Sequence, residues 1–186
     1  MEFLVDLWLP ILIGTIVLFF LSFLFWAVLP HHFGDHGKLP DEDVFMDFLR
    51  SQNIPPGNYI YPCPDKASEQ HSEENVKKYT TGPRGLLDVY EMPNMAVNMS
   101  KTIFYFLVTV STIAYITHVA CPPAEEGLDF MRVFRISGTI AILTYATSNV
   151  LHRVWFKKRI WTEVIDGIVY GLVLGLIFAS FWGYGA

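Results

Sequence analysis

The sequence has few charged residues and almost no cysteine. Only 17% of its 186 residues are charged, whereas 52% are hydrophobic and 16% are aromatic. Soluble domains carry about 25% charged residues, so this composition argues against an ordinary soluble protein. The formal net charge is −5, and nucleic-acid binding requires a basic surface. We therefore predict no nucleic-acid partner.

The N-terminal segment lacks the features of a cleavable signal peptide. Residues 1–30 have no basic region before the apolar run, the run is too long, and no small-x-small cleavage site follows it. Pro10 stands early in the run, where a helix tolerates a missing backbone N–H. We predict that residues 1–29 form a permanent membrane helix.

Catalytic motifs are also missing. The sequence has no nucleophile elbow, no glycine loop that would hold a phosphate, and no paired carboxylates in a common cleft. From this absence we expect a protein that is not an enzyme and that carries no cofactor.

Apolar residues gather in four blocks, at about 7–29, 102–120, 136–151 and 163–182. A helix that crosses a bilayer needs about 20 predominantly apolar residues, and each block reaches that length with its flanks. The pattern predicts an all-α membrane protein with four transmembrane helices. The predicted helices are 1–29, 101–121, 135–152 and 162–184, with an outer loop at 122–134 and a basic inner loop at 153–161.

The distribution of basic residues predicts the orientation. Eleven of the 13 lysines and arginines lie in the 30–101 and 152–161 segments, and only Arg132 and Arg135 lie on the other side. Because cytoplasmic loops are enriched in lysine and arginine, we expect residues 30–101 in the cytoplasm and both termini outside. We expect a bacterial inner membrane as the location. Cys63 and Cys121 then lie on opposite faces and cannot form a disulfide with each other.

The segment 30–100 is predicted to be a mostly cytoplasmic, α+β-like loop domain of about 70 residues, too poor in large apolar groups for a sizeable core. Apolar residues at helical spacing predict an amphipathic helix at 41–51. Short strands are expected at 58–62 and 86–91, where they would pair. Such a thin domain is expected to lean on the membrane helices or on a partner.

Small residues recur every four positions in the last apolar block. Gly167, Gly171, Gly175 and Ala179 lie on one helix face, and the preceding block offers Gly138 and Ala141 as a matching surface. Helices in lipid associate through close backbone approach, which small residues permit. The series predicts a helix-packing seam. A conduction pathway would instead require a polar stripe at this depth.

Two acids, Glu163 and Asp166, stand at the start of the same block. Ionisable residues inside a membrane are functional candidates, and both remain candidate ion or proton residues. A simpler interpretation takes Thr162 as the helix N-cap. Both acids would then lie in the first turns, where the helix dipole favours negative charge.

Two groups of residues are weak metal-binding candidates. His32, Asp35 and His36 have the i, i+3, i+4 spacing that one helix face could offer to zinc. The methionines Met92, Met95 and Met99 would suit Cu(I), and this stretch resembles the methionine pairs of copper transporters. The alternatives are a polar interfacial loop for the histidines and packing for the methionines. We predict no bound metal.

These features together favour a non-catalytic polytopic membrane protein. Its expected partners are the lipid bilayer and either other membrane subunits or further copies of itself. We expect an accessory or scaffold subunit of a larger membrane complex, or a homo-oligomeric membrane assembly. The alternative is a small transporter or an oligomer that conducts an ion or a metal.

Overall fold

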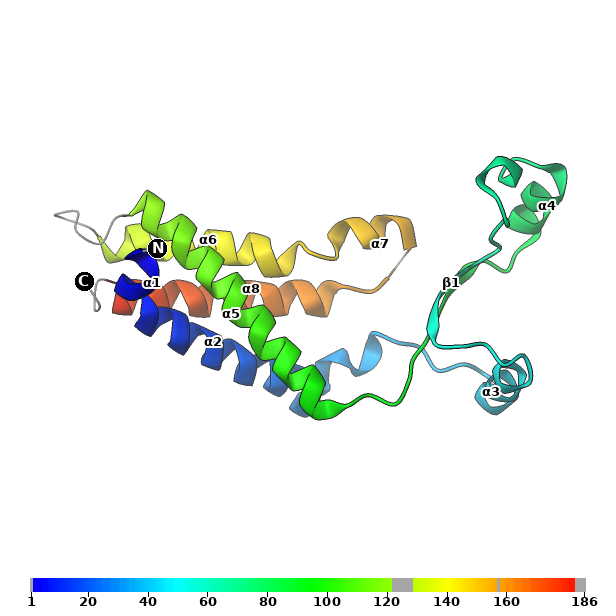
Figure 1. Ribbon diagram of the computed structural model, residues 1–186, viewed down its shortest axis with the longest axis horizontal. Coiled ribbons are helices and arrows are strands. Elements are labelled where there is room, and N and C mark those ends of the chain that lie inside the picture. The colour runs from blue at the N-terminus through cyan, green and yellow to red at the C-terminus, as the bar shows by residue number, and fades with distance from the viewer. Residues whose placement is uncertain (1, 122–128, 157, 183–186) are drawn as a thin grey trace. The chain divides into compact units, whose positions relative to one another are not determined.

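The computed structural model describes residues 2–121, 129–156 and 158–182 and is mostly helical (Figure 1). The chain divides into two compact units. Unit 1 combines Met1–Gly37 with Met95–Ala186, and unit 2 is Lys38–Asn94. The long apolar helices all belong to unit 1, so each unit is described by itself.

The first part of unit 1 is a helix that changes its winding at its end. Its elements are α1 (Glu2–Asp6), α2 (Trp8–Phe23), the π-helical turn η1 (Leu24–Val28) and the 3-10 turn η2 (Pro30–Gly34). The Leu29 amide donates to the carbonyl of Leu24, 2.9 Å away and five residues back. Leu29 itself is extended (φ −81°, ψ 137°), because a residue before proline avoids the helical region. The helix therefore ends at Leu29, and η2 leaves in a new direction.

The second part of unit 1 contains four helices. They are α5 (Met95–Ala120), α6 (Phe130–Ala146), α7 (Val150–Phe156) and α8 (Trp161–Phe181). Among the described residues, three segments are long and apolar enough to cross a membrane, namely Trp8–Val28, Met95–Ala120 and Trp161–Phe181. These three candidate spans suggest a membrane location for the chain.

The third predicted membrane helix, 135–152, differs from the helix that is found. The helix α6 begins earlier, at Phe130, and has only 17 residues, so it is not among the three candidate spans. Asp129 accepts a hydrogen bond from the Met131 amide and starts the helix inside the predicted outer loop, whose residues 122–128 lie outside the described ones. A turn at 147–149 ends it and separates it from α7, which takes in the first residues of the predicted inner loop. Hydroxyl and amide side chains compete for backbone groups, and the Ser148 hydroxyl donates to the Tyr145 carbonyl.

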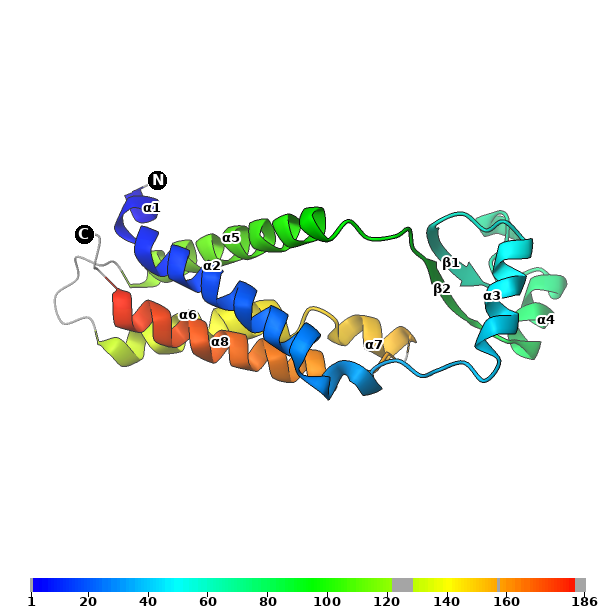
Figure 2. The ribbon, with the colours of Figure 1, turned by 90° about the horizontal axis from the view of Figure 1, so that it is seen from below.

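The long helices of unit 1 pack against one another, with α2 and α6 in contact with both α5 and α8. Helix α8 lies along α6 over most of its length, and α2 contacts both α8 and α5 (Figures 1 and 2). The centre is mainly apolar, with Leu18, Val110, Leu174 and Phe178 inaccessible to solvent. Large apolar side chains also cover the outside of α2, α5 and α8. Such an outer surface suits a lipid environment better than water.

Unit 2 contains two short α-helices and a two-stranded sheet. Its elements are α3 (Glu42–Ser51), β1 (Gly57–Tyr61), the 3-10 turn η3 (Ala67–Glu69), α4 (Glu73–Thr81) and β2 (Gly85–Val89). Strands β1 and β2 are antiparallel, with Gly57 opposite Val89 and Tyr61 opposite Gly85. Helix α3 and strands β1 and β2 begin and end within two residues of the ranges expected from the sequence, 41–51, 58–62 and 86–91. No residue of α3 is buried, so its apolar side chains find no core within this unit.

Candidate functional site

The small residues of α8 lie against the backbone of α6. A Cβ added to Gly171 would stand 2.8 Å from the amide nitrogen of Ile142 and 3.0 Å from the carbonyl oxygen of Gly138. At Gly175 it would stand 3.0 Å from the carbonyl oxygen of Phe134, and at Gly167 it would collide with the backbone at Ala146. The two helices thus approach closely only because these positions have no side chain.

The other residues of the predicted seam also lie where the helices of unit 1 pack together. Ala141 of α6 is fully buried, and Ala179 of α8 packs partly buried against the apolar core. A Cβ at Gly138 would come within 3.3 Å of the Gly171 carbonyl oxygen. The small-residue face of α8 is therefore in contact with a helix of the same chain.

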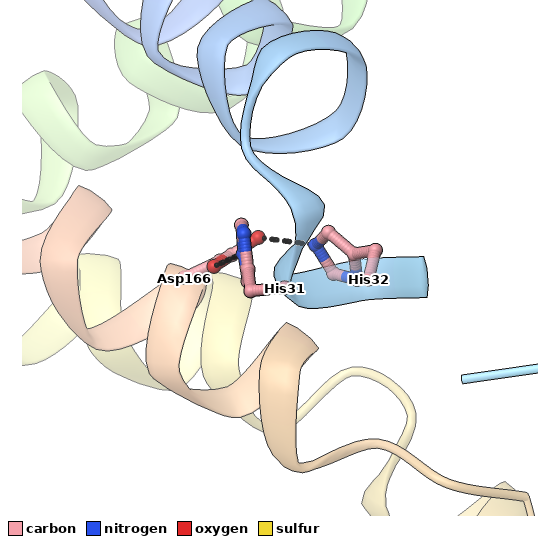
Figure 3. Close-up of side chains that lie close together, drawn as sticks. All are labelled: His31, His32 and Asp166. Atoms are coloured by element: carbon pink, nitrogen blue, oxygen red, sulfur yellow. Dashed lines mark hydrogen bonds and ion pairs between the residues drawn. The ribbon is translucent and has the colours of Figure 1, made fainter. Parts of the chain in front are cut away.

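A polar cluster lies near the start of α8. The turn η2 supplies His31 and His32, and α8 supplies Asp166 (Figure 3). His31 Nε2 lies 3.0 Å from Asp166 Oδ1, and His32 Nε2 lies 2.8 Å from Asp166 Oδ2. Asp166 is only 4% exposed and His32 only 8%. Both oxygens of one buried carboxylate therefore face an imidazole nitrogen, and we call these three residues the His–Asp cluster.

Aromatic rings from the end of the first long helix contact the imidazoles of His31 and His32. Trp26 stacks on His32 with 3.8 Å between the ring centroids and 12° between the planes. Phe25 stands edge-on to His31, with 5.5 Å between centroids and 88° between planes. Both aromatics belong to η1, so the π-helical winding and the turn at Leu29 together set these ring contacts. A tryptophan face also favours a cation over it.

A second carboxylate, Asp35, contacts the other ring nitrogen of His32, Nδ1. Asp35 Oδ2 lies 2.7 Å from His32 Nδ1 and accepts a hydrogen bond of 2.6 Å from the Thr162 hydroxyl. Arg159 donates to the Gly34 carbonyl at 2.8 Å, which places its guanidinium 4.0 Å from Asp35. Two segments far apart in the sequence, 31–35 and 159–166, are thus tied together at one point.

Thr162 is not the N-cap that the sequence indicated. Helix α8 begins at Trp161 after Ile160, and no side chain caps it. Asp166 is therefore more than one turn inside the helix, and its contacts are with His31 and His32. The prediction of Thr162 as the N-cap is therefore wrong. Glu163 lies in the first turn of α8, whereas Asp166 lies beyond that turn and its carboxylate is buried against two imidazoles.

The geometry favours the protonated form of His32. Each ring nitrogen faces a carboxylate oxygen, and each such hydrogen bond needs a proton on the nitrogen. Burial alone lowers the pKa of His32, but the hydrogen bonds and charges of Asp35 and Asp166 outweigh it and raise the pKa. Burial raises the pKa of Asp35, but the Thr162 hydroxyl, His32 and Arg159 together lower it. The hydrogen bonds at both ring nitrogens and the raised pKa therefore favour the protonated form of His32.

The other predicted site residues lie elsewhere. Glu163 forms an ion pair with Lys158 at 2.9 Å and accepts a hydrogen bond from Asn149, so it belongs to a separate pair. His36 is exposed and is not part of the His–Asp cluster. The three methionines are also exposed, Met92 almost completely.

The structure does not bring together the weak metal-binding candidates His32, Asp35 and His36 as one set. The structure brings His31, His32 and Asp166 together, with one ligand atom from each within 4.8 Å of the others. The sequence set assumed a continuous α-helix, whereas η2 is a short 3-10 turn with different side-chain directions. Sequence reasoning missed His31. The signal that could have found it is an acid within an apolar helix together with two histidines directly after another such helix.

Comparison with protein-family models, with curated proteins and with solved structures gave no match for this chain. Its function therefore has to be argued from the geometry alone.

Proposed function

We propose that this chain is a small multi-pass membrane protein that binds a cation at the His–Asp cluster and performs no catalysis. The observation that carries the proposal is the burial of Asp166 against two imidazole nitrogens, at 2.8 and 3.0 Å. The proposal belongs to the transporter or ion-handling class, which the sequence analysis gave as the alternative.

The charges of the site support a cationic ligand. Asp35 and Asp166 contribute two buried carboxylates, and the His32 imidazolium balances only one of them. Arg159 lies 4.0 Å from Asp35, but its side chain is 61% exposed, so water screens much of its charge. An unbalanced buried charge is expensive. A bound cation beside Asp166 and His31 would balance the site.

The proposed topology has four membrane crossings, with both termini outside and residues 30–101 in the cytoplasm of a bacterial inner-membrane protein. In it, α6 would be the third crossing along the chain and the shortest of the four, between Asp129 and the turn at 147–149. The basic residues Arg153, Lys158 and Arg159 support this orientation, because they follow the turn and precede α8. The cluster would then lie at the cytoplasmic boundary of the membrane, within reach of cytoplasmic ions.

A thermal-unfolding experiment tests cation binding. The full chain, purified in detergent and treated with chelator, would be heated with Na⁺, K⁺, Ca²⁺, Mg²⁺, Mn²⁺ or Zn²⁺ at equal ionic strength. One class of cation should raise the unfolding midpoint saturably, because a ligand that binds only the folded state adds about 2.7 kcal/mol at 100 times its Kd. The same series on Asp166→Asn should show no rise. Equal responses of the two proteins, or none at all, would remove the proposal.

A second candidate function is the accessory or scaffold subunit that the sequence analysis favoured. The observation in its favour is α5, whose first ten residues before Tyr105 are mostly exposed and whose buried residues begin at Phe106. Its former support from the small-residue face of α8 is weaker, because α6 already contacts that face. Native mass measurement after mild extraction tests this candidate. A single chain without a partner would exclude it and would leave the cation site unaffected.

A further inference from the structure

We infer that the cation is a divalent first-row transition-metal ion such as Zn²⁺, held by His31 Nε2, His32 Nε2 and the Asp166 carboxylate. The inference rests on the proposed function and specifies the ligand of that same site. It follows from three observations: the donor atoms, their spacing, and the carboxylate that stands behind one of them.

The donor set selects the class of metal. Two imidazole nitrogens and one carboxylate are ligands for zinc and its first-row neighbours. Mg²⁺ and Ca²⁺ prefer sites made of oxygen atoms alone, and Cu(I) prefers sulfur. The exposed thiol of Cys63 belongs to unit 2 and is not part of the cluster. A nitrogen-rich site without thiolate therefore favours a divalent transition metal.

The spacing of the donor atoms is close to that of a coordination shell. With metal–ligand bonds of about 2.0–2.2 Å, neighbouring ligand atoms in a tetrahedral shell lie about 3.3–3.6 Å apart. The two nitrogen–oxygen distances are 2.8 and 3.0 Å, and all three ligand atoms lie within 4.8 Å of one another. Small rotations of the imidazoles would open the two short distances and close the longest one. The backbone of η2 and α8 could stay in place.

The hydrogen bond between His32 Nδ1 and Asp35 is typical of a histidine that binds a metal through its other ring nitrogen. A metal-bound histidine usually donates its other ring nitrogen to a carboxylate, which fixes the ring and raises its basicity. His32 Nδ1 donates to Asp35 at 2.7 Å, and Thr162 holds that same carboxylate oxygen at 2.6 Å. On binding, the metal would replace the proton on His32 Nε2, which leaves to solvent, while the Nδ1 proton stays. Asp35 is thus a positioning residue.

His31 is the donor through which a metal ion can reach the site from solvent. The His31 side chain is 31% exposed, whereas those of His32 and Asp166 are almost completely covered. A metal would therefore arrive from the side of His31 and would meet the two buried ligands behind it. Three protein ligands leave at least one position for water or for an exchanging ligand. Such an open site suits a metal that is bound reversibly.

The test measures metal stoichiometry on the full chain. Purified protein in detergent, freed of metal with a chelator and then desalted, would be equilibrated with Zn²⁺ and analysed by elemental mass spectrometry. We expect about one Zn²⁺ per chain, against none with Mg²⁺. Co²⁺ serves as a spectroscopic probe and should give visible absorption bands without the ultraviolet band of a thiolate ligand. The wild-type spectrum needs no variant, so it remains informative if a variant fails to fold.

Four variants assign the ligands. Asp166→Asn and His31→Gln should lose stoichiometric binding, while Asp35→Asn should weaken the affinity about 10–100-fold, as expected for an outer-shell carboxylate. His36→Gln is the matched control, because His36 lies in the same stretch, is exposed and lies outside the cluster. It should bind as the wild type does.

The outcomes separate this inference from the proposed function. No retained Zn²⁺ and no Co²⁺ bands in folded wild-type protein would overturn the metal inference. The proposed function would survive if Na⁺, K⁺ or Ca²⁺ still raised the unfolding midpoint in an Asp166-dependent way. Metal binding that persists in Asp166→Asn, or that His36→Gln removes, would also overturn the inference, because the ligands would then lie elsewhere.

Discussion

Two regions of α8 are held to the rest of unit 1 by different forces. Near its start, Thr162 and Asp166 bind charged or polar side chains from the segment after α2. Further along, Gly167 and Gly171 touch the backbone of α6 with no polar side chain between them. One helix is thus secured by charge in one place and by shape in the other. Substitutions that change charge at constant volume, or volume at constant charge, should therefore separate the two regions.

The largest effect is expected at the charged end. Asp166→Ala would leave the His32 imidazolium facing one carboxylate fewer inside the protein, and would leave His31 without its acceptor. Removing one partner of a buried pair costs about 3–5 kcal/mol of the free energy of unfolding. Denaturation of micelle-bound protein with SDS, followed by far-UV circular dichroism, would measure it. Glu163→Ala is the control, since the ion pair of Glu163 with Lys158 is partly exposed and should contribute less than about 1 kcal/mol. Equal losses in the two variants would contradict the comparison.

The next effect is expected in the region held by shape. In Gly167→Ala the added methyl group would meet the backbone at Ala146, which cannot rotate away as a side chain can. Overpacking costs about 1–3 kcal/mol, and a backbone collision belongs at the upper end. Thermal unfolding in detergent would show the loss.

Gly37→Ala is the control for that substitution, because a Cβ there has nothing within 4 Å. Its free energy of unfolding should stay within about 0.5 kcal/mol of the wild-type value. A Gly167→Ala protein as stable as Gly37→Ala would mean that α6 and α8 do not approach as closely as described.

The region held by shape was more accessible to sequence reasoning than the charged one. Gly167, Gly171 and Gly175 recur with the helical period, so the spacing alone places them on one face. The sequence also offered Gly138 as a matching surface, and a Cβ there would lie close to the Gly171 carbonyl oxygen. The length of α6 could not be read in the same way, because the turn at 147–149 depends on side chains that compete for backbone groups.

The charged region depends on contacts that no local pattern contains. His32 and Asp166 are separated by 134 positions, and their meeting requires the π-helical turn and the redirection at Leu29. Sequence reasoning treated His32, Asp35 and His36 as one helical set and so looked for a partner of His32 within the same turn. It found Asp35, which does contact His32, and missed Asp166 as the second partner. Pairings of this kind follow from the tertiary fold.

A smaller effect is expected at the hydroxyl that supports Asp35. Thr162→Val keeps the shape of the side chain and removes the donor 2.6 Å from a buried carboxylate oxygen. Hydrogen bonds to charged groups contribute about 1.5–3 kcal/mol, so the loss should be about 2 kcal/mol. Thr112→Val is the matched control, because the Thr112 hydroxyl donates to the carbonyl of Val108 in its own helix. A smaller loss for Thr162→Val than for Thr112→Val would remove Asp35 from the network. Chemical denaturation of both variants in the same detergent provides the measurement.

The smallest effect is expected at Arg159, which is charged but mostly in water. Its guanidinium donates to the Gly34 carbonyl and lies 4.0 Å from Asp35, while its side chain is 61% exposed. Exposed ion pairs contribute about 0–1 kcal/mol and weaken with added salt, so Arg159→Gln should lose about 0.5 kcal/mol at low salt and less at 1 M NaCl. The loss caused by Asp166→Ala should be nearly the same at both salt concentrations, because its partners are buried. Stability curves of both variants at the two concentrations would measure this. If Arg159→Gln instead lost more than about 2 kcal/mol with no dependence on salt, the guanidinium would have to be counted as a buried member of the site. The charge argument for a bound cation would then lose its basis, since Asp35 and Asp166 would already be balanced.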